Sequence, residues 1–139
     1  MKIYYIANAR MPSEKAHGIQ IAKMCEAFIE AGVDLTLVVP RRATEEHSLR
    51  EYYGLRVEIP LVRLAALDWY IGGRLSYVLS SVSFVCSYLY FLWKKKKAGE
   101  QFILYTVDTD WYASSALALL GVPFFSEMHG AKASTFVQR

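Results

Sequence analysis

The sequence predicts an α/β protein with a Rossmann-like, doubly wound parallel sheet of about five strands in the order 3-2-1-4-5. Short β-rich segments alternate with helical segments along the chain, which is the pattern of repeated βαβ units. One of the β-rich segments is a near-continuous apolar run, as expected for a strand that helices cover on both faces. With 139 residues, of which 54% are apolar, the chain fits a single domain with a buried core.

The first βαβ unit is the clearest. We expect a strand at residues 2–7, then a polar loop and a helix that begins near Gly18. Gly32 supplies the left-handed stop of this helix. The apolar strand at residues 35–39 follows, and Pro40 is expected to end it. The core-facing side of the helix is predicted to consist of Ile21, Ala22, Cys25, Phe28 and Ile29.

The later elements continue the alternation. A weak helical pattern covers residues 45–53, and a short third strand is expected at residues 56–60. The fourth strand is expected at residues 102–106 and the fifth at residues 123–127. Between them, a helix capped by Thr109 and Asp110 runs to Leu120, where Gly121 terminates it.

A long helix is predicted at residues 75–93, which carry no charge and precede four lysines at positions 94–97. Length and a positive flank leave a membrane-spanning helix open. The separation of apolar and serine side chains into two stripes instead favours a helix that lies against the sheet, although small residues also pack helices within membranes. The apolar stripe consists of Leu75, Val78, Leu79, Val82, Cys86, Leu89 and Trp93, and the serine stripe of Ser76, Ser80, Ser83 and Ser87.

Composition excludes several classes of function. The net charge is only +3, and the lysine run accounts for four of the positive charges, so a nucleic-acid partner is not expected. A solvated helix end explains the lysines, because cations complement the helix dipole. Contact with anionic lipid headgroups at the inner face of a membrane is the alternative. Its aromatic companions would be Trp69, Tyr70, Tyr88, Tyr90 and Trp93.

The two cysteines, Cys25 and Cys86, have no second Cys or His at ligand spacing. The sequence therefore indicates neither a disulfide framework nor a metal site, and no cofactor is expected. The amino terminus lacks the long apolar core and cleavage site of a signal peptide. A reducing cytoplasm is the simplest compartment.

Polar residues gather where ligands bind in an open parallel sheet, which is outside the carboxyl ends of the strands near the switch in strand order. Three segments are expected to converge there: the loop after the first strand, the turn after the fourth and the end of the fifth. The candidate residues are Asn8, Arg10, Lys15, His17, Gly18, Gln20, Asp108, Asp110, Glu127, His129 and Gly130.

The first of these segments can hold an anion. His17, Gly18 and Gln20 stand at the expected start of a helix, where free backbone N–H groups and the helix dipole favour a negative oxygen. The alternative is that Gly18 merely opens the helix. Because the loop has no G-x-G-x-x-G pattern, neither dinucleotide binding nor a P-loop is supported.

The other segments offer side chains that can bind hydroxyl groups. Glu127 and His129 alternate on the fifth strand and therefore point to the same side, next to Gly130. His129 can bind a sugar hydroxyl or an anion, or be structural. Asp108 can accept hydrogen bonds from a polyol or cap the next helix, and capping is the stronger explanation for Asp110.

These segments together resemble the family 4 retaining glycosyltransferases of the GT-B fold. Residues 1–18 look like that family's first strand and acceptor loop, and residues 22–38 look like the following helix and strand. Residues 104–108 and 121–130 look like its Y-T-R-D and E-x-H segments. The likeness covers nearly the whole chain. Val107 replaces the arginine of Y-T-R-D, and the first loop lacks the paired glycines that many relatives have.

The resemblance implies transfer of a sugar from a nucleotide-sugar donor to a saccharide or lipid-linked acceptor, with retention and without an obligatory metal. It implies that His17 and Gly18 lie near the donor phosphate and acceptor, and that His129 faces the reacting sugar as the catalytic residue. In the family, the N-terminal domain holds the acceptor and a C-terminal domain holds the donor through an E-x7-E type motif.

We therefore expect residues 1–139 to be a single, incomplete acceptor-side domain that is inactive without a donor-binding domain or partner chain. A last strand with an unpaired edge invites pairing with another chain, so we also expect self-association. A non-catalytic α/β module that binds a ligand or partner is the alternative, because fold alone does not decide function.

Overall fold

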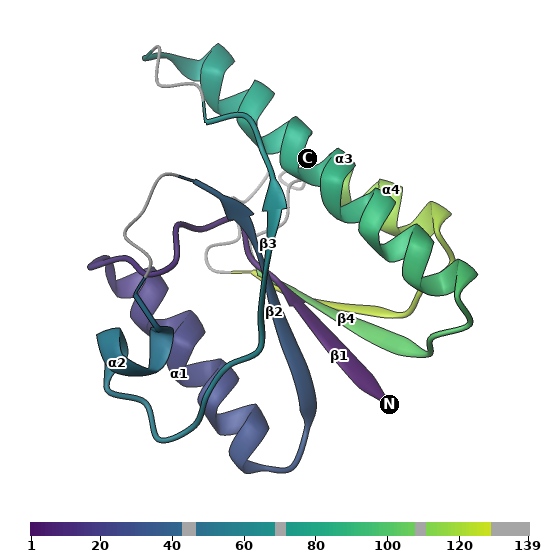
Figure 1. The fold of residues 1–139 in the computed structure, drawn as a ribbon. Coiled ribbons are helices and arrows are strands. Elements are labelled where there is room, and N and C mark those ends of the chain that lie inside the picture. Colours follow the sequence, from purple (N-terminus) through teal and green to yellow (C-terminus); the bar gives the residue numbers. More distant parts are fainter. Residues whose placement is uncertain (43–46, 69–71, 108–110, 129–139) are drawn as a thin grey trace, which may run out of the picture.

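The computed structural model describes residues 1–42, 47–68, 72–107 and 111–128, and it has a parallel five-stranded sheet in the order β3-β2-β1-β4-β5 (Figure 1). The predicted fold class is therefore confirmed. The switch in strand order lies at β1, between β2 and β4. The elements are β1 (Lys2–Ile6), α1 (Ala16–Glu30), β2 (Asp34–Arg41), α2 (Leu49–Tyr53), β3 (Leu61–Ala65), α3 (Arg74–Lys97), β4 (Phe102–Val107), α4 (Trp111–Leu119) and β5 (Phe124–Glu127).

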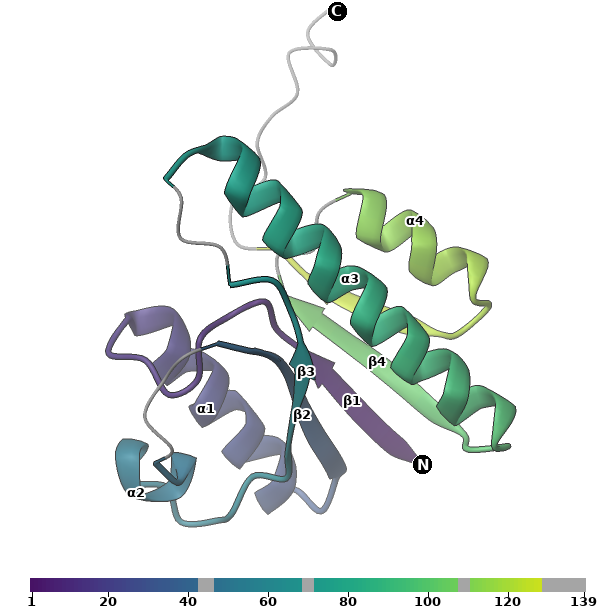
Figure 2. The ribbon, with the colours of Figure 1, turned by 45° about the horizontal axis from the view of Figure 1, so that its top comes forward.

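Helices cover the two faces of the sheet as separate layers, with α1 and α2 on one face and α3 and α4 on the other (Figures 1 and 2). Alternation along β1 sends Tyr5 and Ala7 into the cluster beneath α1, and Tyr4 and Ile6 into the cluster beneath α3. Both faces of the central strands are therefore buried, which explains the unbroken apolar run of β2.

Most predicted elements are confirmed. Helix α1 buries Ile21, Ala22 and Cys25, and Gly32 has the predicted left-handed backbone, with φ of 85°. The fourth and fifth strands and the helix between them are also present. Local patterns were sufficient here because each element carries its own start or stop residue.

The third strand was predicted five residues too early. It spans Leu61–Ala65 instead of residues 56–60, and pairing with β2 begins where the Leu37 N–H donates to the Pro60 carbonyl at 2.8 Å. The preceding segment is not paired with β2 at Arg56, because the Arg56 N–H donates to the Glu26 side chain of α1 at 2.6 Å. The first residue of the predicted strand, Arg56, is thus still part of the crossover over α1. The helix predicted at residues 45–53 is described only as Leu49–Tyr53.

Pro40 does not end the second strand, which continues to Arg41. The N–H of Leu37 points toward β3, so the nitrogen of residue 40 falls on the side of β1. Strand β1 has already ended at Ile6, opposite Val38. The missing N–H of Pro40 therefore lies just past the last pair that β1 and β2 share, and the pairing of β2 with β3 continues beyond it.

The long helix faces the opposite way from what its apolar stripe predicts. The side chains that α3 buries against the sheet are Ser80, Ser81, Phe84, Tyr88 and Leu92, whereas Leu75, Val78, Leu79, Val82, Cys86 and Trp93 of the stripe are exposed.

Serine hydroxyls explain this rotation of α3. The Leu67 N–H donates to Ser83 Oγ at 2.8 Å, and Ser87 Oγ donates to the Ala65 carbonyl at 2.5 Å. Ala65 ends β3, an edge strand, so these bonds satisfy backbone groups that no strand pairs there. Ser83 and Ser87 of the serine stripe therefore lie beside the end of β3, Ser80 is buried, and the apolar stripe turns away from the sheet.

Among the described residues, α3 is also the helix that is long and apolar enough to cross a membrane, by length and composition alone. Its packing on β3 and its buried aromatic side chains are those of a helix in a sheet layer. Length and hydropathy are thus weak evidence for a membrane span in this case.

A buried carboxylate ties α1 to the segment before β3. The Glu26 side chain is 10% exposed, accepts the Arg56 N–H and pairs with Lys23 Nζ at 2.9 Å. The Arg56 N–H bond, followed by the bond from Lys23, lowers the pKa of Glu26 from 4.5. The ionised form therefore stabilises the fold at neutral pH.

We expect Glu26→Gln to lower the melting temperature at pH 7, because a charged acceptor binds the Arg56 N–H and Lys23 more strongly than an amide does. A lowered folded-state pKa gives stability that is present above pH 4.5 and is lost as the pH falls through the folded value. The difference between the two proteins should therefore shrink below about pH 4. Thermal melts from pH 3 to 7 measure it.

Glu30→Gln is the matched control, since Glu30 lies one turn farther along α1, is partly exposed and meets Arg56 only at 3.6 Å. Its melting temperature should stay near that of the wild type throughout. A Glu26→Gln effect that does not depend on pH would contradict the assigned role of the charge.

Candidate functional site

Two adjoining hollows lie where β1 and β2 end, at the carboxyl edge of the sheet. The first, the basic crevice, has a volume of about 230 Å³, and the second, the α3 hollow, about 200 Å³. Arg10 and Arg42 line both hollows. The basic crevice is completed by Asn8, Ala9, Ser13, Lys15 and His17, and the α3 hollow by Asp68, Gly72, Ser76, Tyr77 and Ser80.

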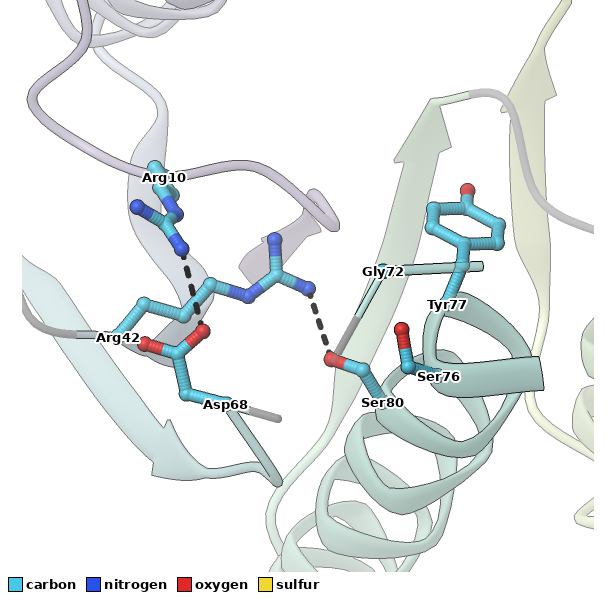
Figure 3. A pocket seen from close by; sticks show the side chains of 7 residues that line it. All are labelled: Arg10, Arg42, Asp68, Gly72, Ser76, Tyr77 and Ser80. Atoms are coloured by element: carbon cyan, nitrogen blue, oxygen red, sulfur yellow. Dashed lines mark hydrogen bonds and ion pairs between the residues drawn. The ribbon is translucent and has the colours of Figure 1, made fainter. Parts of the chain in front are cut away.

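Arg42 connects the two hollows. It directly follows β2, and its guanidinium donates to Asn8 Oδ1 at 2.8 Å. It also donates to Ser80 Oγ at 3.4 Å (Figure 3). The Asn8 amide in turn donates to Ser81 Oγ of α3 at 3.1 Å. Side chains after β1, after β2 and from α3 are thus held in one polar network.

A second guanidinium lies beside the first. Arg10 forms an ion pair with Asp68 at 3.2 Å, and Figure 3 shows Arg42 extending past this pair toward α3. Burial, followed by the positive charge of Arg10, lowers the pKa of Arg42, while Asp68 acts in the opposite sense. Among the described residues, the Asp68 carboxylate therefore lies near both guanidinium groups. Guanidinium N–H groups gathered in this way suit an anionic ligand.

The loop that carries Arg10 is anchored from the α2 side. The Tyr53 hydroxyl accepts the Ser13 N–H at 2.6 Å and donates to the Ser13 carbonyl at 2.8 Å. Arg63 of β3 donates to the Met11 carbonyl at 3.3 Å. These bonds fix the backbone of this loop at Met11 and Ser13 and pre-form one wall of the crevice.

The glycine that opens α1 has a packing role. Gly18 is buried, and a Cβ at this position would lie 2.8 Å from the Tyr53 hydroxyl and 3.2 Å from the Ser13 carbonyl. Glycine is thus required for Tyr53 to reach Ser13. The helix also begins earlier than predicted, at Ala16, and the N–H groups of Gly18 and Ile19 both donate to the Lys15 carbonyl. These two amides therefore do not point at an anion in the crevice.

The predicted site residues divide into three groups. His17 lines the basic crevice, whereas Gln20 is exposed on α1 and lines neither hollow. Glu127 ends β5, on the other side of β1. Asp108, His129 and Gly130, with Asp110, lie outside the described residues, so their roles stay predictions.

Glu127 is held in place by a tyrosine. The Tyr105 hydroxyl donates to Glu127 Oε2 at 2.7 Å, and the Tyr105 ring packs in the cluster beneath α1. Burial, followed by the hydrogen bond to Glu127, raises the pKa of Tyr105 to about 12. Tyr105 therefore remains a neutral donor, and Glu127 presents its carboxylate at the end of the sheet.

With this geometry described, we compared the chain with known proteins. No protein-family model and no curated protein sequence matches it. Within the described ranges, no group of three or more His, Cys, Asp or Glu side chains is placed to hold a metal ion.

Sequence reasoning missed Arg42, Asp68 and Ser80. A signal for Arg42 was present, because it directly follows the apolar second strand and the carboxyl-edge rule applies to that strand too. Asp68 and Ser80 carried no such signal. They reach the site because β3 starts later than predicted and because α3 turns its serine side inward.

We expect Gly18→Ala to cost about 1–3 kcal/mol of stability, because the methyl group would displace Tyr53 and Ser13. In a Tyr53→Phe background the same substitution should cost less, since the nearest clashing atom is gone. Chemical denaturation of the four proteins of this cycle measures the coupling. Strictly additive effects would contradict the proposed close contact.

Proposed function

We propose that this chain is the acceptor-side domain of a retaining sugar transferase of the GT-B type. The observation that carries the proposal is the basic crevice, a polar and cationic hollow at the carboxyl edge of a parallel sheet, next to the switch in strand order. Ligands of open α/β sheets bind at this place. The resemblance of residues 1–18 and 121–130 to family 4 enzymes supports the same reading.

The charges of the crevice favour an acceptor with an anionic group. Arg10, Lys15 and Arg42 lie along its wall, with Asp68 as the nearby carboxylate. Arginine matches the geometry of phosphate and carboxylate oxygens through paired N–H donors. A phosphorylated saccharide or a lipid-linked sugar phosphate has such a group.

The remaining polar side chains suit the sugar part of that acceptor. The Asn8 amide and the Ser76 and Ser80 hydroxyl groups each donate and accept hydrogen bonds, as sugar hydroxyls do. Tyr77, which is exposed, offers an aromatic ring beside them. In this proposal the crevice holds the charge of the acceptor, and the α3 hollow holds its sugar.

The reacting centre is assigned to the other side of β1. His129 is proposed to face the donor sugar, and Glu127, positioned by Tyr105, to bind hydroxyl groups near it. The nucleotide sugar itself would be bound by a further domain or a partner chain. The task of this chain is then to hold the acceptor hydroxyl in line with the sugar that is transferred.

We expect the chain to bind a sugar 1-phosphate, and Arg42→Gln to weaken this binding about 10- to 100-fold, because a charge-assisted hydrogen bond is lost. The same sugar without phosphate should bind more weakly than the sugar phosphate. Isothermal titration calorimetry with both ligands and with inorganic phosphate measures these differences.

Arg50→Gln is the matched control, because Arg50 is an exposed arginine of α2 that lines neither hollow. Equal binding by Arg42→Gln and the wild type would refute the assignment of the crevice. Binding of phosphate alone, with no gain from the sugar, would favour the non-catalytic binding module instead of a transferase.

A further inference from the structure

The side of α3 that faces away from the sheet is apolar, although the solvent-facing side of a helix in such a layer usually carries polar and charged residues. Leu75 is 73% exposed and Tyr90 62%, and Val78, Leu79, Val82 and Trp93 are exposed between them. With 3.6 residues per turn, these six residues lie on one side of the helix, roughly opposite Phe84 and Tyr88. We call them the outer stripe. From Leu75 to Trp93 it extends about 27 Å.

Other helices do not cover the outer stripe within the described part of the chain. Helix α4 lies alongside α3 (Figures 1 and 2) and contributes Ala113 and Leu117 to the buried cluster between the helices and the sheet. The sheet lies against the inner side of α3. The outer stripe therefore faces away from both.

Lysines and aromatic rings are combined at the C-terminal end of the outer stripe. Lys94 Nζ lies 5.7 Å from the ring centroid of Tyr90, and Lys97 Nζ lies 5.1 Å from that of Trp93. The two rings stack with centroids 6.1 Å apart. Aromatic rings prefer the boundary between lipid tails and headgroups, and lysines just outside it attract anionic headgroups.

The four lysines do not all serve one purpose. Lys95 pairs with Glu100 at 3.2 Å, and Lys96 donates to the Leu120 carbonyl, so both tie α3 to neighbouring segments. Lys94 and Lys97 are exposed beside the outer stripe. Their ammonium groups are thus placed to meet negative charge on the same surface that the stripe would enter.

We propose that α3 lies flat on an anionic lipid bilayer, with the outer stripe in the headgroup boundary and Lys94 and Lys97 against acidic headgroups. An amphipathic helix in this position buries its apolar side about 5–10 Å deep while its other side stays out of the lipid. Here that other side is packed on the sheet through Phe84, Tyr88 and Leu92. Crossing the membrane would require α3 to leave the sheet, whereas lying on it requires no change of fold.

Docking in this orientation places the α3 hollow beside the membrane. Ser76, Tyr77 and Ser80 belong to the first two turns of α3, so the helix that enters the headgroup region also forms one wall of the hollow. The proposal rests on α3 alone and does not require the transferase function.

Flotation with vesicles tests this. The chain should float with vesicles of phosphatidylcholine and phosphatidylglycerol mixed at about 3:1, and most of it should stay unbound with vesicles of phosphatidylcholine alone. It should dissociate from the anionic vesicles at about 1 M salt, because the Debye length is then only about 3 Å. Replacing Lys94 and Lys97 together by glutamine should lower the partition coefficient about 30-fold. Leu75→Ser with Val82→Ser should lower it about tenfold or more.

Matched controls lie on the opposite helical layer. Ile19→Ser removes an exposed apolar side chain of α1, and Arg50→Gln removes an exposed charge of α2, and neither should change flotation. Circular dichroism and thermal melts confirm that each variant is folded. Quenching of Trp93 fluorescence by brominated lipid, lost in Trp93→Phe, reports that the outer stripe itself enters the boundary.

Three results would overturn the proposal. The first is a wild-type chain that does not float with anionic vesicles. The second is flotation that alkaline carbonate does not reverse, because α3 would then span the bilayer. The third is a wild-type chain that binds no vesicles but sediments as a dimer, with Leu75→Ser plus Val82→Ser converting the dimer to a monomer. A second copy of the chain would then cover the outer stripe. A chain that floats but binds no sugar phosphate would support membrane docking and reject the proposed function.

Discussion

The rotation of α3 about its own axis is the constraint on which the rest of this molecule depends. Two serine hydroxyl groups set it: Ser83 accepts the Leu67 N–H, and Ser87 donates to the Ala65 carbonyl. The Ala65 carbonyl lies at the end of β3, an edge strand, and the Leu67 N–H lies in the segment that follows it, past the last residue paired with β2. In this orientation the side chains that α3 buries include Phe84, Tyr88 and Leu92, which pack in the cluster between the helix and the sheet.

The same rotation builds the candidate site and exposes the outer stripe. With its serine side inward, α3 offers Ser80 to Arg42 and Ser81 to Asn8, and the two loops after β1 and β2 are thereby joined. A rotation that buried the apolar stripe would remove these hydroxyl groups from the crevice. The polar site and the apolar surface are thus two consequences of one packing choice, and they share a helix.

The crevice is also supported from the opposite layer. Tyr53 of α2 holds both backbone groups of Ser13, and it reaches them only because Gly18 has no side chain. The Glu26 carboxylate keeps the segment before β3 close to α1. Since Asp68 follows β3, the path of this segment also affects the pair that Asp68 forms with Arg10. Charges in the site are therefore positioned by contacts that never touch a ligand.

Local sequence determined the strands and helices whose own residues mark them: the apolar β2, the face of α1 with Ile21 and Cys25, and the stop at Gly32. Alternation of these elements also determined the strand order and hence the position of the carboxyl edge, where His17 lines the basic crevice. Tertiary structure alone decided the start of β3, the passage of β2 through Pro40, the direction of the α3 stripe and the entry of Asp68 and Ser80 into the site. The physical reason is common to all four, because each depends on a backbone or side-chain hydrogen bond to a partner that is distant in sequence. The periodicity within one segment contains no information about that partner.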